Sequence, residues 1–182
     1  MSPSGDHDRE QFCSGSEALD RYFQTQASQD IKRRLAACFE AVGQDTQAVA
    51  GYYTLTATSV ALSAFPLEIA KKLPRYPVVP AVLLARLAVI RSYQGQGLGG
   101  ILLADALNRV SRAEFGVFAL VVDAKDEVAQ RFYEHRGQGS RRVSWRKSWK
   151  RITRQASVPA PRRFAQFVLW PDSSSYNKYL WN

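Results

Sequence analysis

The most constraining feature of the sequence is a loop with four glycines in six positions, residues 95–100, between an apolar run and an amphipathic pattern. Residues 81–90 before it are almost wholly apolar and have the length of a strand buried on both faces. Residues 101–113 carry apolar side chains on one helical stripe, and residues 116–122 form a second apolar run. Strand, loop, helix and strand make a βαβ unit, whose strands we expect to be parallel with a right-handed crossover. The predicted fold class is therefore α/β or α+β.

The glycine loop predicts a bound phosphate or pyrophosphate. Glycines allow backbone N–H groups to approach an anion, and the start of the following helix adds partial positive charge. The alternative is a flexible turn before a helix. Gly95, Gly97 and Gly100 also fit the dinucleotide pattern G-x-G-x-x-G, and Asp123 ends the next strand about where a ribose-binding acid belongs. In a dinucleotide fold, however, the turn begins directly after the strand, whereas residues 91–94 intervene here, and several more βα units would have to fit into the roughly 60 residues after Asp123.

The remaining periodicities predict further elements around this unit. Residues 16–40 carry apolar side chains at spacings of three, four and eight, which indicates one or two amphipathic helices. Residues 48–61 are rich in β-branched and aromatic side chains and predict a strand. Short helices are expected within residues 65–73 and 126–135.

Composition excludes several classes of protein. The two cysteines, Cys13 and Cys38, cannot form a disulfide scaffold, and the only histidines, His7 and His135, give no metal-ligand spacing, so no metal is expected. The longest apolar run, residues 78–85, contains a proline and is far shorter than the roughly 20 residues of a membrane span. The N-terminus is acidic and lacks an apolar core, unlike a secretory signal. We therefore expect a cytoplasmic protein with no membrane partner.

Four motifs together resemble one enzyme family. Gln94-x-x-Gly97-x-Gly99 resembles the pyrophosphate loop Q/R-x-x-G-x-G/A of the GNAT family of N-acetyltransferases. Residues 86–89 (RLAV), 51–55 (GYYTL) and 131–135 (RFYEH) are similar to the toxin branch of that family, whose members are encoded beside a ribbon-helix-helix antitoxin. The resemblance covers about residues 10–135.

The resemblance implies the GNAT fold, a mixed central sheet flanked by helices with a V-shaped split between the fourth and fifth strands. These strands would be residues 83–89 and 118–122. Acetyl-CoA is expected to lie in the split, with its pantetheine arm paired to the fourth strand and its pyrophosphate on the loop. The implied cofactor-binding residues are Leu87, Ala88, Val89, Gln94, Gly95, Gln96, Gly97, Leu98, Gly99 and Gly100. Tyr133 matches the family's general acid, which protonates the departing thiolate; the alternative is a helix aromatic that packs beside Phe132.

The resemblance further implies that the substrate is aminoacyl-tRNA, whose α-amine is acetylated so that translation stops. The ester bond of a charged tRNA makes that amine less basic, which suits a site with no evident general base. Arg86, Lys32 and Arg75 are candidate substrate-binding residues, although each alone also fits a solvated surface charge. The expected protein partners are a ribbon-helix-helix antitoxin and a second copy of the chain in a homodimer. Two alternatives stay open: a catalytically weak binding module for antitoxin or RNA, and an N-acetyltransferase for small molecules or proteins.

The charge balance and the resemblance both change after His135. Residues 1–135 hold 14 Lys and Arg against 15 Asp and Glu, a net charge of −1, whereas residues 136–182 hold 11 against 1, a net charge of +10. We therefore predict an acetyltransferase domain over residues 1–135 and a basic divergent segment over residues 136–182. Three interpretations of this segment stay open: a frame-shifted or rearranged C-terminus, a basic extension whose Trp145, Trp149 and Ile152 line one helical face, or a long insertion whose residues 164–170 return as the last strand.

Overall fold

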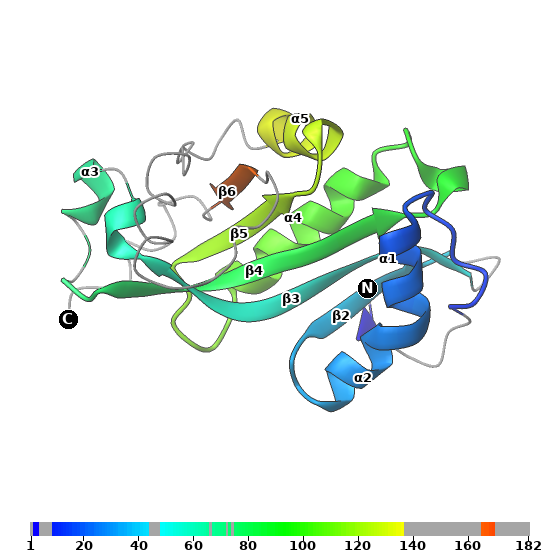
Figure 1. The fold of residues 1–182 in the computed structure, drawn as a ribbon, viewed down its shortest axis with the longest axis horizontal. Helices are drawn as coiled ribbons and strands as arrows, with labels where there is room; N and C mark the ends of the chain where they lie inside the picture. The colour runs from blue at the N-terminus through cyan, green and yellow to red at the C-terminus, as the bar shows by residue number, and fades with distance from the viewer. Residues whose placement is uncertain are drawn as a thin grey trace. The chain divides into compact units, whose positions relative to one another are not determined.

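The chain divides into two compact units that alternate along the sequence. The first consists of Met1–Ala57 and Leu84–Arg109, and the second of Thr58–Leu83 and Val110–Asn182. A computed structural model, drawn in Figure 1, describes residues 2–3, 9–43, 48–65, 67–71, 73, 75–136 and 165–169.

The strands form a six-stranded sheet in sequence order, and helices flank it, which confirms the α/β class. Each of the pairs β1–β2, β2–β3 and β5–β6 is antiparallel. The strands are β1 (Ser2–Pro3), β2 (Ala37–Val42), β3 (Val49–Ala61), β4 (Val78–Val89), β5 (Ala119–Ala124) and β6 (Ala165–Leu169). The helices are α1 (Glu17–Arg21), the π-helical η1 (Tyr22–Gln26), α2 (Ala27–Lys32), the 3₁₀ turn η2 (Leu62–Ala64), α3 (Leu67–Ala70), the 3₁₀ turn η3 (Arg91–Tyr93), α4 (Leu98–Ser111) and α5 (Glu127–Arg136).

In the first unit, both faces of the first half of β3 are buried. Tyr52 and Tyr53 of β3 are fully buried yet lie on opposite faces, because side chains alternate along a strand. Tyr52 stacks on Phe23 of η1 with ring centroids 4.1 Å apart, whereas the Tyr53 hydroxyl hydrogen-bonds to Asp105 of α4. The continuous helical segment α1–η1–α2 therefore packs on one face and α4 on the other.

The N-terminal helical segment is shorter than the sequence pattern predicts. It ends at Lys32, and Arg34 takes a left-handed conformation with φ of 58°, which stops the helix. Strand β2 begins three residues later, so the helix expected over residues 37–40 is wrong. The spacing of four between Leu35 and Phe39 misled the prediction, because four fits the helical period and is also a multiple of the strand period of two.

Gly51 lets α4 and β4 lie close to β3. A Cβ at this position would lie 2.9 Å from the carbonyl oxygen of Ala88 and 3.0 Å from Cδ1 of Leu102. One of these contacts is with backbone, which moves only at a cost. A larger residue would therefore displace the elements that carry the glycine loop.

The second unit has a core of its own. Its buried members are Val60, Ala64, Phe65, Val79, Ala81, Ala119 and Val121. Phe65 and Phe118 meet edge to face with centroids 5.6 Å apart. Helix α5 packs against β5.

After α5 the chain returns to the sheet in β6. This strand pairs with β5 in antiparallel register, from Leu120 opposite Leu169 to Ala124 opposite Ala165. The other residues of 137–182, including the predicted helical face of Trp145, Trp149 and Ile152, lie outside the described residues. The domain boundary after residue 135 stays a prediction.

Candidate functional site

The glycine loop joins the end of β4 to the start of α4 in the first unit. Gly95 and Gly97 have φ values of 76° and 84°, in the left-handed region that glycine adopts without strain. A Cβ on either residue would meet no atom within 4 Å. The backbone conformation therefore favours glycine at both positions, and no packing within the protein excludes a side chain there.

Backbone donors gather where α4 begins. The Gly97 carbonyl accepts hydrogen bonds from the N–H groups of Gly100 at 2.9 Å and Ile101 at 3.2 Å. The N–H groups of Leu98 and Gly99 lie in the first turn of α4, ahead of the first N–H group that is bonded within the helix. No carbonyl of the helix therefore accepts a hydrogen bond from them. Residues 94–97 are exposed. The loop and the positive end of the helix dipole therefore form a site that an anion can reach.

Two glutamine side chains brace this loop. The Gln94 amide nitrogen donates to the carbonyl oxygens of Ser14 at 2.7 Å and Val89 at 2.8 Å. The Gln96 amide nitrogen donates to the Ser92 carbonyl at 2.7 Å. Both amide nitrogens thus bond to backbone of the first unit.

The strand before the loop holds the other predicted cofactor-binding residues. Ala88 is buried against the core formed by η1, β2 and β3, while Leu87 and Val89 are half-buried. Immediately after β4, the N–H of Ile90 donates to the Ala50 carbonyl at 2.9 Å. The end of β4 is therefore fixed to β3 next to the loop.

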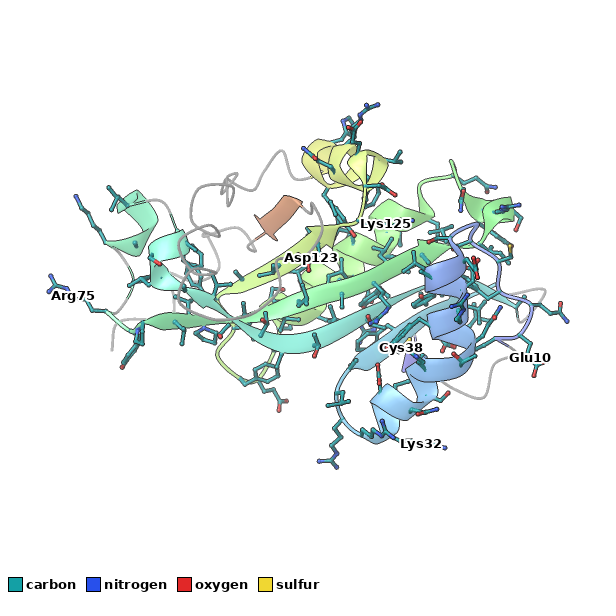
Figure 2. The ribbon with its side chains drawn as sticks, viewed as in Figure 1. Glu10, Lys32, Cys38, Arg75, Asp123 and Lys125 are labelled. Atoms are coloured by element: carbon teal, nitrogen blue, oxygen red, sulfur yellow. The ribbon has the colours of Figure 1, made fainter. Side chains whose placement is uncertain are left out.

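Arg86 has a defined place on the face of β4 that α1–η1–α2 covers. Its guanidinium carbon lies 3.4 Å from the centre of the Tyr22 ring, a cation–π contact. The Tyr22 hydroxyl donates to Asp30 of α2 at 2.9 Å. Burial and this hydrogen bond raise the pKa of Tyr22 to about 12, although the Arg86 charge acts in the opposite direction. Lys32, at the end of α2, is exposed (Figure 2).

Tyr133 and Arg75 belong to the second unit. Tyr133 of α5 is 7% exposed, and its ring meets Phe132 edge to face at 5.1 Å. Burial, and secondly the negative charge of Asp123 in β5, raise the pKa of the Tyr133 hydroxyl to about 12, so this phenol keeps its proton at neutral pH. Asp126 caps α5 by accepting from the Ala129 N–H at 2.8 Å. Arg75 is exposed just before β4 (Figure 2).

Sequence reasoning missed the residues that position these groups. The Ser14 backbone carbonyl accepts from Gln94, and the face of the Tyr22 ring contacts Arg86. The Asp30 side chain in turn accepts from the hydroxyl of Tyr22, eight residues before it in the chain. Such contacts have no fixed spacing, so no motif reports them. The sequence pattern predicts Asp123 only as a ribose-binding candidate, whereas in the structure its charge helps to raise the pKa of Tyr133.

Two further properties bear on the chemistry of the site. Within the part of the chain that the structure describes, no three His, Cys, Asp or Glu residues are grouped so that they could hold a metal ion. Among the same residues, no helix has the length and apolar character needed to cross a bilayer.

Comparisons with known proteins give consistent matches. The model of the acetyltransferase (GNAT) family matches residues 8–138. A tRNA-acetylating toxin of Mycobacterium tuberculosis (strain ATCC 25618 / H37Rv) is 36% identical over 126 residues, which cover 68% of this chain and 74% of the toxin. The structure of AtaT complexed with acetyl-methionyl-tRNAfMet is similar with a TM-score of 0.73 and 28% identity, covering 96% of this chain and 92% of that one. The structure of AtaTR bound with AcCoA is similar with a TM-score of 0.67 and 27% identity, covering 92% and 90%.

Proposed function

Because the chain belongs to the GNAT family of acetyltransferases, we propose that it transfers the acetyl group of acetyl-CoA to the α-amine of an aminoacyl-tRNA and so blocks translation. The observation that carries this proposal is the exposed loop of residues 94–97, which precedes the free N–H groups at the start of α4. Such a loop suits the pyrophosphate of acetyl-CoA, which is the co-substrate.

The substrate class rests on the relatives. The M. tuberculosis relative is named as a tRNA-acetylating toxin, and AtaT is described in complex with acetyl-methionyl-tRNAfMet. A charged tRNA offers an α-amine whose basicity is lowered by the neighbouring ester. A larger share of that amine is therefore neutral near pH 7, and only the neutral form attacks a thioester.

The proton balance defines what Tyr133 has to do. The amine nitrogen bonds to the acetyl carbon, the carbon–sulfur bond breaks, and one proton moves overall from nitrogen to sulfur. The pKa of the Tyr133 phenol is about 12, whereas that of the thiol formed is near 8.5. Complete proton transfer from this phenol to the thiolate is therefore unfavourable by about 5 kcal/mol. Tyr133 therefore acts as the general acid only if its proton is replaced during the transfer by the one that leaves the nitrogen, which becomes acidic once the new bond forms.

The other site residues have proposed roles in the same reaction. The backbone of Leu87, Ala88 and Val89 pairs with the pantetheine arm, and the loop of residues 94–100 holds the pyrophosphate through its backbone N–H groups. Arg86, fixed on the Tyr22 ring, contacts the charged tRNA, and the exposed Lys32 and Arg75 bind its phosphates.

The proposal extends to partners and location. A toxin of this kind is expected to pair with a ribbon-helix-helix antitoxin, to form a homodimer and to act in the cytoplasm, where charged tRNA is found. Residues 1–135 are the proposed catalytic domain, and residues 136–182 the proposed divergent segment.

Cell-free translation tests the proposed function directly. We expect the purified protein to stop synthesis only when acetyl-CoA is present, and fresh aminoacyl-tRNA to restore it for a time in proportion to the amount added. Inhibition without acetyl-CoA would favour a binding module that sequesters RNA. Turnover of acetyl-CoA on polyamines or peptides, with translation unaffected, would favour a small-molecule or protein acetyltransferase.

A further inference from the structure

The residues just before α1 lie against the base of the glycine loop. The Arg91 N–H donates to the Cys13 carbonyl at 3.0 Å, and the Gln94 amide nitrogen donates to the Ser14 carbonyl at 2.7 Å. Gly15 has φ of 88°, and a Cβ there would lie 2.9 Å from Nε of Arg91. Three successive residues, 13–15, therefore contact the segment that leads into the loop.

One carboxylate holds this segment in place. Oδ1 of Asp20, in α1, accepts hydrogen bonds from the Ser14 backbone N–H at 2.9 Å and from the Ser14 hydroxyl at 2.6 Å. The Ser14 hydroxyl oxygen also accepts from the Ser16 N–H at 3.3 Å. Because the same residue, Ser14, bonds to Asp20 on one side and to Gln94 on the other, α1 and the loop are linked through it.

The Gln94 side chain completes the link. A primary amide has two N–H donors, and here the two acceptors are the carbonyls of Ser14 and Val89. Both donors are thus used within the protein. The amide ties the end of β4 to residue 14 and fixes the point from which the loop starts.

We propose that Asp20 is a positioning residue for the acetyl-CoA loop and that it acts through Ser14 and Gln94. This inference rests on the proposed function, because it assigns the loop to acetyl-CoA. The loop residues 94–97 are exposed, so the loop has to be held by its base. Preorganised N–H groups bind an anion more tightly than mobile ones, since less conformational entropy is lost on binding. Gln94 therefore assists acetyl-CoA binding as a brace, and Asp20 does so without contacting the ligand.

The sign of the effect separates this role from simple electrostatics. Removal of a negative charge should strengthen the binding of an anion at any distance. Loss of the brace should instead weaken it. For Asp20→Ala we expect an acetyl-CoA dissociation constant about tenfold higher, as for the loss of one or two modest hydrogen bonds. Glu17→Ala is the matched control, because Glu17 lies in the same helix and carries the same charge but, among the residues that the structure describes, pairs only with Arg21 on the surface.

A double-mutant cycle tests the path. Gln94→Ala should weaken acetyl-CoA binding by a similar factor, and the double variant Asp20→Ala/Gln94→Ala should bind no more weakly than the poorer single variant. Gln94→Arg should retain binding, since a guanidinium also donates to carbonyls. Multiplicative effects of the two alanine changes would show that Gln94 touches the cofactor independently of Asp20 and would overturn the path.

Hydrogen exchange in the absence of acetyl-CoA tests the brace apart from the proposed function. The amides of Arg91, Gly100 and Ile101 are hydrogen-bonded to backbone carbonyls at the two ends of the loop. They should exchange faster in Asp20→Ala and in the milder Ser14→Ala than in wild type, and at the wild-type rate in Glu17→Ala. Unchanged exchange in the first two variants, or acetyl-CoA binding by Asp20→Ala as tight as wild type, would refute the inference. Faster exchange in the Asp20→Ala and Ser14→Ala variants, together with a wild type that binds no acetyl-CoA, would support the brace and contradict the proposed function.

Discussion

Gly97→Asp places a negative charge at the start of α4 with little expected effect on folding. The wild-type φ of 84° costs a non-glycine residue about 1 kcal/mol, and less for Asp and Asn, which tolerate this region best. A Cβ there meets no atom within 4 Å, so no steric clash adds to that cost. A carboxylate at a helix N-terminus returns roughly 0.3–1 kcal/mol. We therefore expect the melting temperature to change by only a few degrees.

The same substitution should abolish tight acetyl-CoA binding. A carboxylate about 5 Å from a phosphate charge opposes it by roughly 1–3 kcal/mol, depending on the local dielectric. The two phosphates of a pyrophosphate therefore give at least about 2 kcal/mol, or roughly a 30-fold rise in the dissociation constant. Gly97→Asn is the matched control, because it has the same shape and backbone preference without the charge, and it isolates the steric part.

Isothermal titration with acetyl-CoA at two salt concentrations measures both parts. The difference between the Asp and Asn variants should shrink at high salt, since screening weakens the charge repulsion. Equal affinities of wild type and Gly97→Asp, with both proteins folded, would show that the loop does not hold the pyrophosphate.

Four further predictions follow from the contacts within each unit. Tyr133→Phe should lower kcat by roughly 10²–10⁴-fold in steady-state assays and leave acetyl-CoA affinity unchanged. A kcat within a few-fold of wild type would show that Tyr133 is a packing residue and not the general acid. The pKa of Tyr133 is raised from 10 to about 12 in the folded protein, so its contribution to stability is present below pH 10 and is lost as pH rises through 12. Urea denaturation between pH 10 and 12 should therefore show a smaller loss of unfolding free energy in Tyr133→Phe than in wild type. Glu40→Ala should destabilise the fold by about 3–5 kcal/mol in chemical denaturation, because it leaves Arg9 without its buried partner, and a loss below 1 kcal/mol would contradict this. Gly51→Ala should cost about 1–3 kcal/mol through its contacts with backbone, while Gly116→Ala, which meets open space, should not.

The fold around the loop was predictable because its signals are local. The apolar run of residues 81–90 has the length of a buried strand, and the apolar stripe on residues 101–113 has the period of a helix. The glycines lie between these two patterns, and the structure places β4, the loop and α4 there. The motifs in the same stretch also identified the family correctly. Residues 37–40 were misread because Leu35 and Phe39 satisfy two periods at once, and only pairing with β3 decides between them.

The arrangement of side chains around the site was not predictable from spacing. The place of Arg86 depends on the Tyr22 ring, and that of Gln94 on the Ser14 carbonyl, 80 residues away along the chain. The shift in the pKa of Tyr133 depends on burial by residues that the sequence does not connect. Such properties arise from tertiary packing, so the sequence predicts which groups take part in the site better than it predicts what each one contacts.

The position of the transferred acetyl group tests the central claim most directly. Charged tRNA is incubated with the protein and labelled acetyl-CoA and then digested with a nuclease, and the 3′-terminal fragment is analysed by mass spectrometry. The account predicts N-acetyl-aminoacyl-adenosine with wild type and none with Gly97→Asp or with uncharged tRNA. If a folded wild-type protein that binds acetyl-CoA leaves the α-amine unmodified on every aminoacyl-tRNA tested, the proposed function is wrong.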